Sequence, residues 1–120
     1  MDTPEEGERI IVTRRQYLGM YFDGKKRMEV FHSPLRRCTY VIGCDGLLWA
    51  RVRVTGYIHL KTRTKWRRFF RFHRENCLWP LYGKHTWGTL FYIEEIAEVP
   101  FPYDQAHGTH RIVEYKLDES

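Results

Sequence analysis

The pattern of apolar and polar positions predicts a chain built mainly of short strands. Six stretches are rich in β-branched and aromatic side chains, which is typical of strands: 9–13, 27–31, 38–43, 47–60, 89–99 and 109–117. The pattern of 89–99 also permits a helix. The sequence CDG at 44–46 predicts a turn between two of the strands, YGKH at 82–85 a second turn, and 100–108 a loop.

The longest of these stretches, 47–60, alternates strictly along its first half. Leu48, Ala50, Val52 and Val54 share one face, and the opposite face carries the polar and aromatic side chains of Trp49, Arg51 and Arg53. We therefore expect a strand with one buried side and one basic side.

Two segments carry helical spacing instead. In 14–23 the apolar positions Tyr17, Leu18 and Tyr21 fall together, and Gly24 is suited to end the helix. In 64–78 one apolar stripe follows the helical period, with Thr64 as N-cap and Pro80 beyond its end; its members are Trp66, Phe69, Phe70, His73 and Cys77. Together the elements predict an α+β fold, a small and mostly antiparallel β-barrel, closed or half closed, with two or three flanking helices.

The length of 120 residues fits one domain. We expect a disordered acidic tail over 1–8, a single domain over 9–117 and a short tail over 118–120. The apolar runs are far shorter than the roughly 20 residues that cross a bilayer, and no N-terminal stretch has the pattern of a signal peptide. We therefore expect an intracellular protein with no membrane association. The three cysteines, Cys38, Cys44 and Cys77, have irregular spacing, which favours reduced thiols over disulfides or a zinc site.

The charge is unevenly distributed. All 20 lysines and arginines lie between Arg9 and Lys116, whereas six of the 15 acids lie at the two ends, so the body of the chain carries +11. Such a field favours a polyanionic partner, most often a nucleic acid. A generic basic surface with no such partner is the alternative.

The predicted second helix carries the densest charge. Seven basic residues fall within 61–74: Lys61, Arg63, Lys65, Arg67, Arg68, Arg71 and Arg74. Arrays of this kind contact phosphates and give salt-dependent affinity. Phe72 lies off the apolar stripe among the arginines, where it either stacks on a base or packs under a neighbouring loop.

A second charged motif, GKKRME, occupies 24–29 between apolar residues. A loop after Gly24 would bring Lys26 and Glu29 together, and such a pair in a cleft serves as a general base or an anion clamp. The alternative, favoured by the frequency of surface ion pairs, is a solvated salt bridge. His107 and His110 in HGTH have no third ligand nearby, so we expect neither a metal nor a cofactor.

The stretch 11–31, IVTRRQYLGMYFDGKKRMEVF, resembles the opening of ASCH domains, the activating-signal-cointegrator homology group of the PUA-like superfamily. These domains typically open with a strand, a short helix and the motif G-x-K-x-x-E-x-R. Gly24, Lys26 and Glu29 match it, but Phe31 replaces the final arginine, and Arg36 or Arg37 is our candidate to supply the missing guanidinium. The resemblance continues more loosely through 44–60 and 87–102.

The resemblance implies a small β-barrel that binds RNA or a modified base in a cleft. Some small bacterial ASCH proteins are amidohydrolases of acetylcytidine that use a lysine, a threonine three residues on and a glutamate, and others are reported as nucleases. Lys26 matches the lysine, Glu29 occupies the threonine position, and Glu75 is a loose counterpart of the glutamate. Because position 29 lacks a hydroxyl, a hydrolase here would activate water, with Glu29 as base and Lys26 holding the oxyanion.

Our leading hypothesis is a module, taken as a monomer, that binds single-stranded RNA or a modified nucleotide. Basic and aromatic residues would make the contacts: Lys25, Lys26, Arg27, Tyr40, Trp49, Arg51, Arg53, Lys65, Arg67, Arg68, Arg71, Phe72 and Arg74. One alternative is a hydrolase of acetylcytidine or RNA in which Lys26, Glu29 and Glu75 are catalytic. The other is a protein-interaction module whose basic helix docks an acidic partner.

Overall fold

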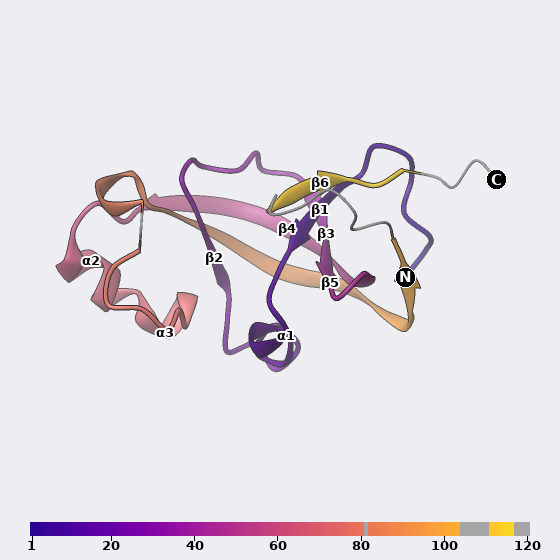
Figure 1. The fold of residues 1–120 in the computed structure, drawn as a ribbon, viewed down its shortest axis with the longest axis horizontal. Coiled ribbons are helices and arrows are strands. Elements are labelled where there is room, and N and C mark those ends of the chain that lie inside the picture. Colours follow the sequence, from indigo (N-terminus) through magenta and orange to yellow (C-terminus); the bar gives the residue numbers. More distant parts are fainter. Residues whose placement is uncertain (81, 104–110, 117–120) are drawn as a thin grey trace.

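A computed structural model describes residues 1–80, 82–103 and 111–116 of the chain (Figure 1). Its six strands are β1 (Arg9–Val12), β2 (Met28–Phe31), β3 (Thr39–Cys44), β4 (Leu47–His59), β5 (Trp87–Pro102) and β6 (Ile112–Glu114). The helices are α1 (Arg15–Phe22), α2 (Arg63–Arg68), α3 (Phe70–His73) and a single 3-10 turn, η1 (Gly83–His85).

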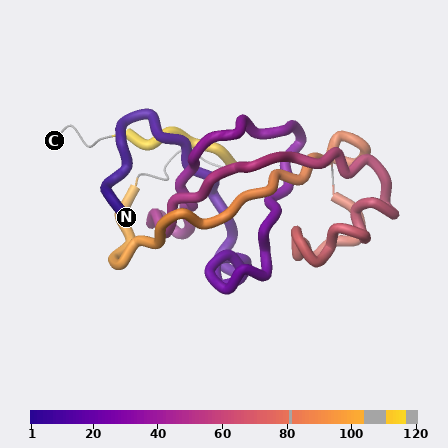
Figure 2. Tube along the Cα trace, turned by 180° about the vertical axis from the view of Figure 1, so that it is seen from behind, coloured from indigo at the N-terminus to yellow at the C-terminus, as the bar shows by residue number. Residues whose placement is uncertain are grey.

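The strands form one curled sheet in the order β2-β5-β4-β3-β1-β6. Only β1 and β3 pair in parallel, and the other neighbours in the described sheet are antiparallel. The predicted small, mostly antiparallel α+β fold is therefore confirmed, as a half-barrel. The long strands β4 and β5 run side by side through the molecule, with α2 and α3 at one end (Figure 2).

The predicted strand is confirmed in β4, where Leu48, Ala50, Val52 and Val54 are all buried. A register shift between Leu48 and Ala50, however, places Leu48 in a different apolar cluster from Val52 and Val54, so the four do not share one face as predicted. Asp45 and Gly46, between β3 and β4, both have positive φ angles, of 53° and 76°, as a two-residue hairpin turn requires.

The segment 89–99 is strand rather than helix, and β5 continues through Pro102 into the residues that we predicted as a loop. Beyond Leu90, β5 no longer pairs with β2, and no other described strand pairs with it on that side. Proline is tolerated at such an edge because no neighbouring strand needs its missing N–H group.

The predicted continuous helix over 64–78 is wrong. Thr62, not Thr64, caps α2, since its hydroxyl accepts from the Lys65 N–H at 3.1 Å. The helix breaks at Phe69, and α3 ends at Arg74, which adopts a left-handed conformation with φ of 53°. Because of the break, the residues after Phe69 no longer follow the helical period of α2. Phe70 is therefore 48% exposed, and of the predicted stripe only Trp66 and His73 are buried.

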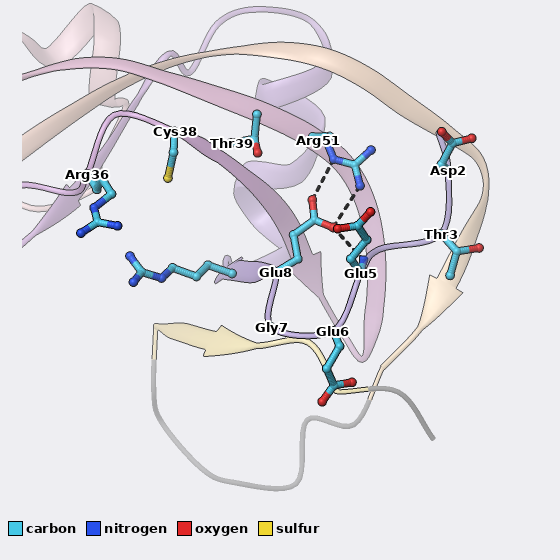
Figure 3. Close-up of a pocket in the computed structure, with 11 residues that line it drawn as sticks. Asp2, Thr3, Glu5, Glu6, Gly7, Glu8, Arg36, Cys38, Thr39 and Arg51 are labelled. Carbon is cyan, nitrogen blue, oxygen red and sulfur yellow. Dashed lines mark hydrogen bonds and ion pairs between the residues drawn. The ribbon is translucent and has the colours of Figure 1, made fainter. Parts of the chain in front are cut away.

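The N-terminal residues, which we predicted as a disordered tail, lie along the sheet. The Gly7 N–H donates to the Tyr115 carbonyl at 2.8 Å, and the Tyr115 N–H donates to the Glu8 carbonyl at 2.8 Å. The Glu8 carboxylate accepts two hydrogen bonds from Arg51, at 2.8 and 3.1 Å, beside a cavity of about 570 Å³ (Figure 3). Acidic residues of 2–8 thus neutralise part of the basic outer face of β4.

Within the described part of the chain, no helix combines the length and the apolar character that crossing a bilayer requires. Cys38, Cys44 and Cys77 are free thiols. The predicted HGTH histidines, His107 and His110, lie outside the described residues, as do both ends of the strand predicted over 109–117.

Candidate functional site

A cleft of about 570 Å³ opens where the two edges of the half-barrel approach each other. Residues from the end of β1, from α1, from β2 and from the segment after α3 line it: Val12, Thr13, Arg14, Gln16, Tyr17, Glu29, Val30, Glu75, Asn76, Cys77, Pro80, Tyr82 and Arg111. Its volume is in the range of small-molecule sites, and its wall combines aromatic rings with a few charged groups.

Glu29 lies at the base of this cleft. Alternation along β2 directs Met28 and Val30 into the apolar cluster beneath α2, and Glu29 to the opposite side. The Tyr21 hydroxyl donates to one carboxylate oxygen, and Arg111 Nη2 lies 2.9 Å from the other. Complete burial raises the pKa of Glu29 to about 7, although Arg111 acts in the opposite direction. This carboxyl group therefore exchanges its proton near neutral pH.

Lys26 reaches the same cluster from the turn after α1. The positive φ angle of Gly24, 77°, reverses the chain there, and the Lys26 N–H donates to the Met20 carbonyl at 3.0 Å. The Lys26 side chain is fully buried, so the interpretation of the 24–29 motif as a solvated salt bridge is wrong. Its Nζ atom lies 3.1 Å from Glu75 Oε1 and 3.9 Å from Glu29 Oε1.

Burial lowers the pKa of Lys26 to about 8, and the ion pair with Glu75 opposes that effect. Burial alone would raise the pKa of Glu75, but the charge and hydrogen bond of Lys26, with a hydrogen bond from Tyr17, outweigh it and hold that pKa below its usual value. Perturbed groups gathered in a cleft indicate a functional site.

His73 fixes the position of Glu75. Its Nδ1 atom accepts from the Glu75 N–H at 3.0 Å, and its Nε2 atom donates to the Trp66 carbonyl at 2.9 Å. The two bonds define one neutral tautomer, and burial lowers the pKa of the ring. The His73 carbonyl also accepts from Lys26 Nζ, so this residue holds both partners of the ion pair.

Arg111 is the site residue that the sequence did not indicate. Its Nη1 atom donates to the Val30 carbonyl at 2.9 Å, and its guanidinium lies 4.7 Å from the centre of the Phe31 ring. Arg111, which lies just before β6, thus supplies the guanidinium that the motif lacks at position 31. Our prediction of Arg36 or Arg37 for this role is wrong, because Arg36 lines the N-terminal cavity (Figure 3) and Arg37 lies over Tyr57.

Comparison with known proteins gives a match among solved structures but none by sequence. Neither a protein-family model nor a curated protein matches the sequence. Among solved structures, a crystal structure of a mutant ZmASCH protein from Zymomonas mobilis superimposes with a TM-score of 0.67 and 14% sequence identity, covering 95% of this chain and 92% of that one. The chain has an ASCH-like fold. At this identity the likeness concerns the fold, and it confirms the fold expected from 11–31.

Within the ASCH-like fold, Lys26, Glu29 and Glu75 come together as one cluster, although Glu75 lies far from the other two in the sequence. This is the set that the resemblance implied for catalysis. Lys26 itself does not line the cleft, because Glu75 and the His73 carbonyl cover its amino group.

The predicted stacking residues are largely unavailable. Tyr40 is buried in the core, at 1% exposure, so it cannot stack on a base as we predicted. Phe72 is partly buried, with the guanidinium groups of Arg27 and Arg71 at 4.6 and 5.1 Å from its ring centre. Phe70 is instead exposed among these arginines. Because the helix breaks at Phe69, Phe70 takes the exposed position that we predicted for Phe72.

The predicted contacts on β4 do not line the cleft. The Trp49 indole donates to the Cys44 carbonyl at 3.1 Å. Arg51 is paired with Glu8, and Arg53 with Glu94, so neither guanidinium is freely available to a phosphate. RNA contacts by these three residues would therefore have to be made outside the cleft, and they stay a prediction.

The remaining predicted contacts lie near the ends of the helices. Lys25 pairs with Asp23 at 3.8 Å on the surface. On α2 and α3, Arg67, Arg68 and Arg71 are exposed, and Lys65 and Arg74 are half-buried. Phosphate contacts by these residues stay a prediction. Among the described residues, no group of three His, Cys, Asp or Glu side chains is placed to hold a metal ion.

Proposed function

We propose that this ASCH-like domain binds single-stranded RNA and holds one unpaired base in the cleft. One observation carries the proposal: two carboxylates and a guanidinium, from Glu29, Glu75 and Arg111, converge on the wall of a cavity of about 570 Å³. Unpaired bases expose hydrogen-bonding edges that such groups recognise, and single-stranded RNA is read mainly in this way.

The chemistry of the wall supports a base rather than an apolar ligand. The Glu75 carboxylate, which its lowered pKa keeps ionised at neutral pH, is suited to accept from an exocyclic amino group. Arg111 uses one guanidinium nitrogen for Val30 and one for Glu29, and is suited to donate its other N–H groups to a base carbonyl. Tyr17 and Tyr82 supply the aromatic part of the wall.

Lys26 is a positioning residue in this proposal. Its amino group is buried behind Glu75, where it holds the carboxylate in place and keeps it charged. The ligand contacts that we first assigned to Lys26 therefore pass to Arg111. Arg14 at the mouth of the cleft and the exposed arginines of α2 and α3 are available for phosphates.

The proposal is tested by fluorescence-anisotropy titration of a labelled single-stranded RNA. Arg111→Gln removes a charge-assisted contact and should weaken binding about tenfold or more, since hydrogen bonds to charged groups contribute about 1.5–3 kcal/mol. Arg15→Gln is the matched control, because Arg15 is 84% exposed and pairs with Asp45 away from the cleft. Binding should also weaken as salt rises. Equal effects of the two substitutions, or no binding by the unmodified protein, would remove the proposal.

The pKa of Glu29 favours one second candidate, a hydrolase that removes an acyl group from cytidine. A buried carboxyl with a pKa of about 7 is suited to take a proton from water. Arg111, which faces the cleft, is better placed than Lys26 to stabilise the oxyanion.

This candidate predicts release of acetate from acetylcytidine, with a rate that rises as pH passes through about 7. Glu29→Gln should abolish the rate while RNA binding remains measurable. Absence of product over pH 6 to 9 would eliminate the candidate and leave the binding proposal intact.

A further inference from the structure

Outside the cleft, three aromatic rings are in contact where the end of β4 pairs with the start of β5. The rings of His59 and Trp87 stack with their centres 4.2 Å apart and their planes within 4°. Tyr57 meets Trp87 edge to face at 5.6 Å, and 44% of Tyr57 is exposed. We call Tyr57, His59 and Trp87 the ring platform. Its geometry follows from the sheet, since Tyr57 and His59 share a face of β4 and Trp87 is paired with His59 in register.

Positively charged residues surround the ring platform. The Arg37 guanidinium lies 5.5 Å from the centre of the Tyr57 ring. His59 Nε2 donates to the carbonyl of the exposed Lys84 at 2.6 Å. Beyond His59, the chain continues through the exposed Lys61 into the basic α2. Exposed rings beside arginine and lysine are the pattern with which proteins stack single-stranded nucleic acids.

The ring platform is connected to the cleft by one short turn. Tyr82 lines the cleft, and Lys84 in η1 contacts the platform through His59. Two residues span at most about 7 Å. The cleft and the platform therefore both adjoin this turn, close enough for one strand of RNA to contact both.

We infer that the ring platform is a second contact surface for the same RNA, stacking bases next to the one held in the cleft. The inference rests on the proposed function, because the cleft sets where the strand begins. Stacking on a protein ring contributes about 5- to 150-fold in affinity per base. The platform would therefore make affinity depend on RNA length.

The test compares two ligands and two matched substitutions. The ligands are a labelled eight-nucleotide RNA of random sequence and the four nucleoside monophosphates, titrated by anisotropy and by NMR respectively. Tyr57→Leu removes the exposed ring and keeps an apolar side chain. Tyr92→Leu is the control, since Tyr92 is also exposed, at 51%, but lies further along β5 opposite Arg53.

Tyr57→Leu should weaken binding of the octanucleotide at least fivefold and leave monophosphate binding unchanged. Tyr92→Leu should change neither, and Tyr57→Phe, which keeps a ring, should bind like the unmodified protein. If Tyr57→Leu and Tyr92→Leu weaken octanucleotide binding equally, the proposal that the ring platform binds RNA is wrong. A loss of monophosphate binding in Tyr57→Leu would also refute it.

Failure of the platform is distinguishable from failure of the cleft. If Arg111→Gln weakens the octanucleotide and Tyr57→Leu does not, the platform is wrong and the cleft stands. If Tyr57→Leu weakens it and Arg111→Gln does not, the cleft proposal is wrong and the rings bind the RNA without it. If the unmodified protein binds no RNA, both are wrong.

Discussion

Replacing Glu29 by glutamine should change how the stability of the domain depends on pH. In the unfolded chain this carboxyl loses its proton near 4.5, whereas burial raises its pKa in the folded domain to about 7. Between these values the folded state binds more protons than the unfolded state. The free energy of unfolding therefore falls as pH rises from about 4.5 to about 7.

The size of this fall follows from the two pKa values. Each pKa unit between the folded and unfolded states corresponds to about 1.4 kcal/mol, so Glu29 accounts for about 3 kcal/mol across the window. Glutamine has a similar shape and does not titrate. About 2 kcal/mol of this falls between pH 5 and pH 7, because the carboxyl group titrates only partly at the two ends of that range. Glu29→Gln should therefore lose about 2 kcal/mol less than the unmodified protein between pH 5 and pH 7, whatever the substitution does to the absolute stability.

The measurement is urea denaturation at pH 5, 6 and 7, followed by tryptophan fluorescence. Glu98→Gln is the control, because it removes an exposed carboxylate from β5 and should leave the pH dependence as it is in the unmodified protein. If Glu29→Gln and Glu98→Gln lose stability in parallel over this range, Glu29 is ionised throughout, and the argument from its burial is wrong.

Three further substitutions test other parts of the structure. Lys26→Met should lower the free energy of unfolding by about 3–5 kcal/mol, because it leaves its buried carboxylate partner without a counter-charge; a loss below 1 kcal/mol in urea would contradict the buried ion pair. Gly43→Ala should cost about 1–3 kcal/mol in thermal denaturation, because the new Cβ atom would lie 2.7 Å from Ile10 Cγ2, and an unchanged midpoint would show that this contact relaxes freely. Glu8→Gln should strengthen RNA binding and steepen its salt dependence, because it frees Arg51 for a phosphate; identical titrations would show that RNA does not reach this face.

The parts of the fold that depend on local period are predictable from the sequence. Alternation over 50–54 indicates both the strand and its buried side, because each side chain's face is set by its neighbours alone. The register shifts at Leu48/Ala50 and Val54/Gly56, which change the faces beyond this stretch, are not visible in the pattern. The helix over 64–78 is different. Nothing in its apolar spacing reveals the break at Phe69, which depends on how Trp66 and His73 pack beneath it. The break exposes Phe70 and covers Phe72. The wrong prediction of a continuous helix therefore led us to name Phe72 rather than Phe70 as a ring for stacking.

The site, like the fold, has residues that the local sequence indicates and a residue that it does not. Lys26 and Glu29 are indicated by a short motif, and Glu75 only as a loose counterpart of a glutamate in the family that the sequence resembles. Arg111 meets Glu29 because the sheet curls until the residue before β6 faces β2. Such a contact depends on the curvature of the whole sheet, and no local pattern records it.

The Arg111 contact has a consequence for self-association. A half-barrel ends in two unpaired margins, and exposed main-chain groups at such margins recruit strands from other molecules. At the β2 margin the Val30 carbonyl is already occupied by the Arg111 side chain. We therefore expect Arg111, the residue that we propose for ligand recognition, also to keep neighbouring copies from adding to the sheet, so that replacing it should favour intermolecular aggregates.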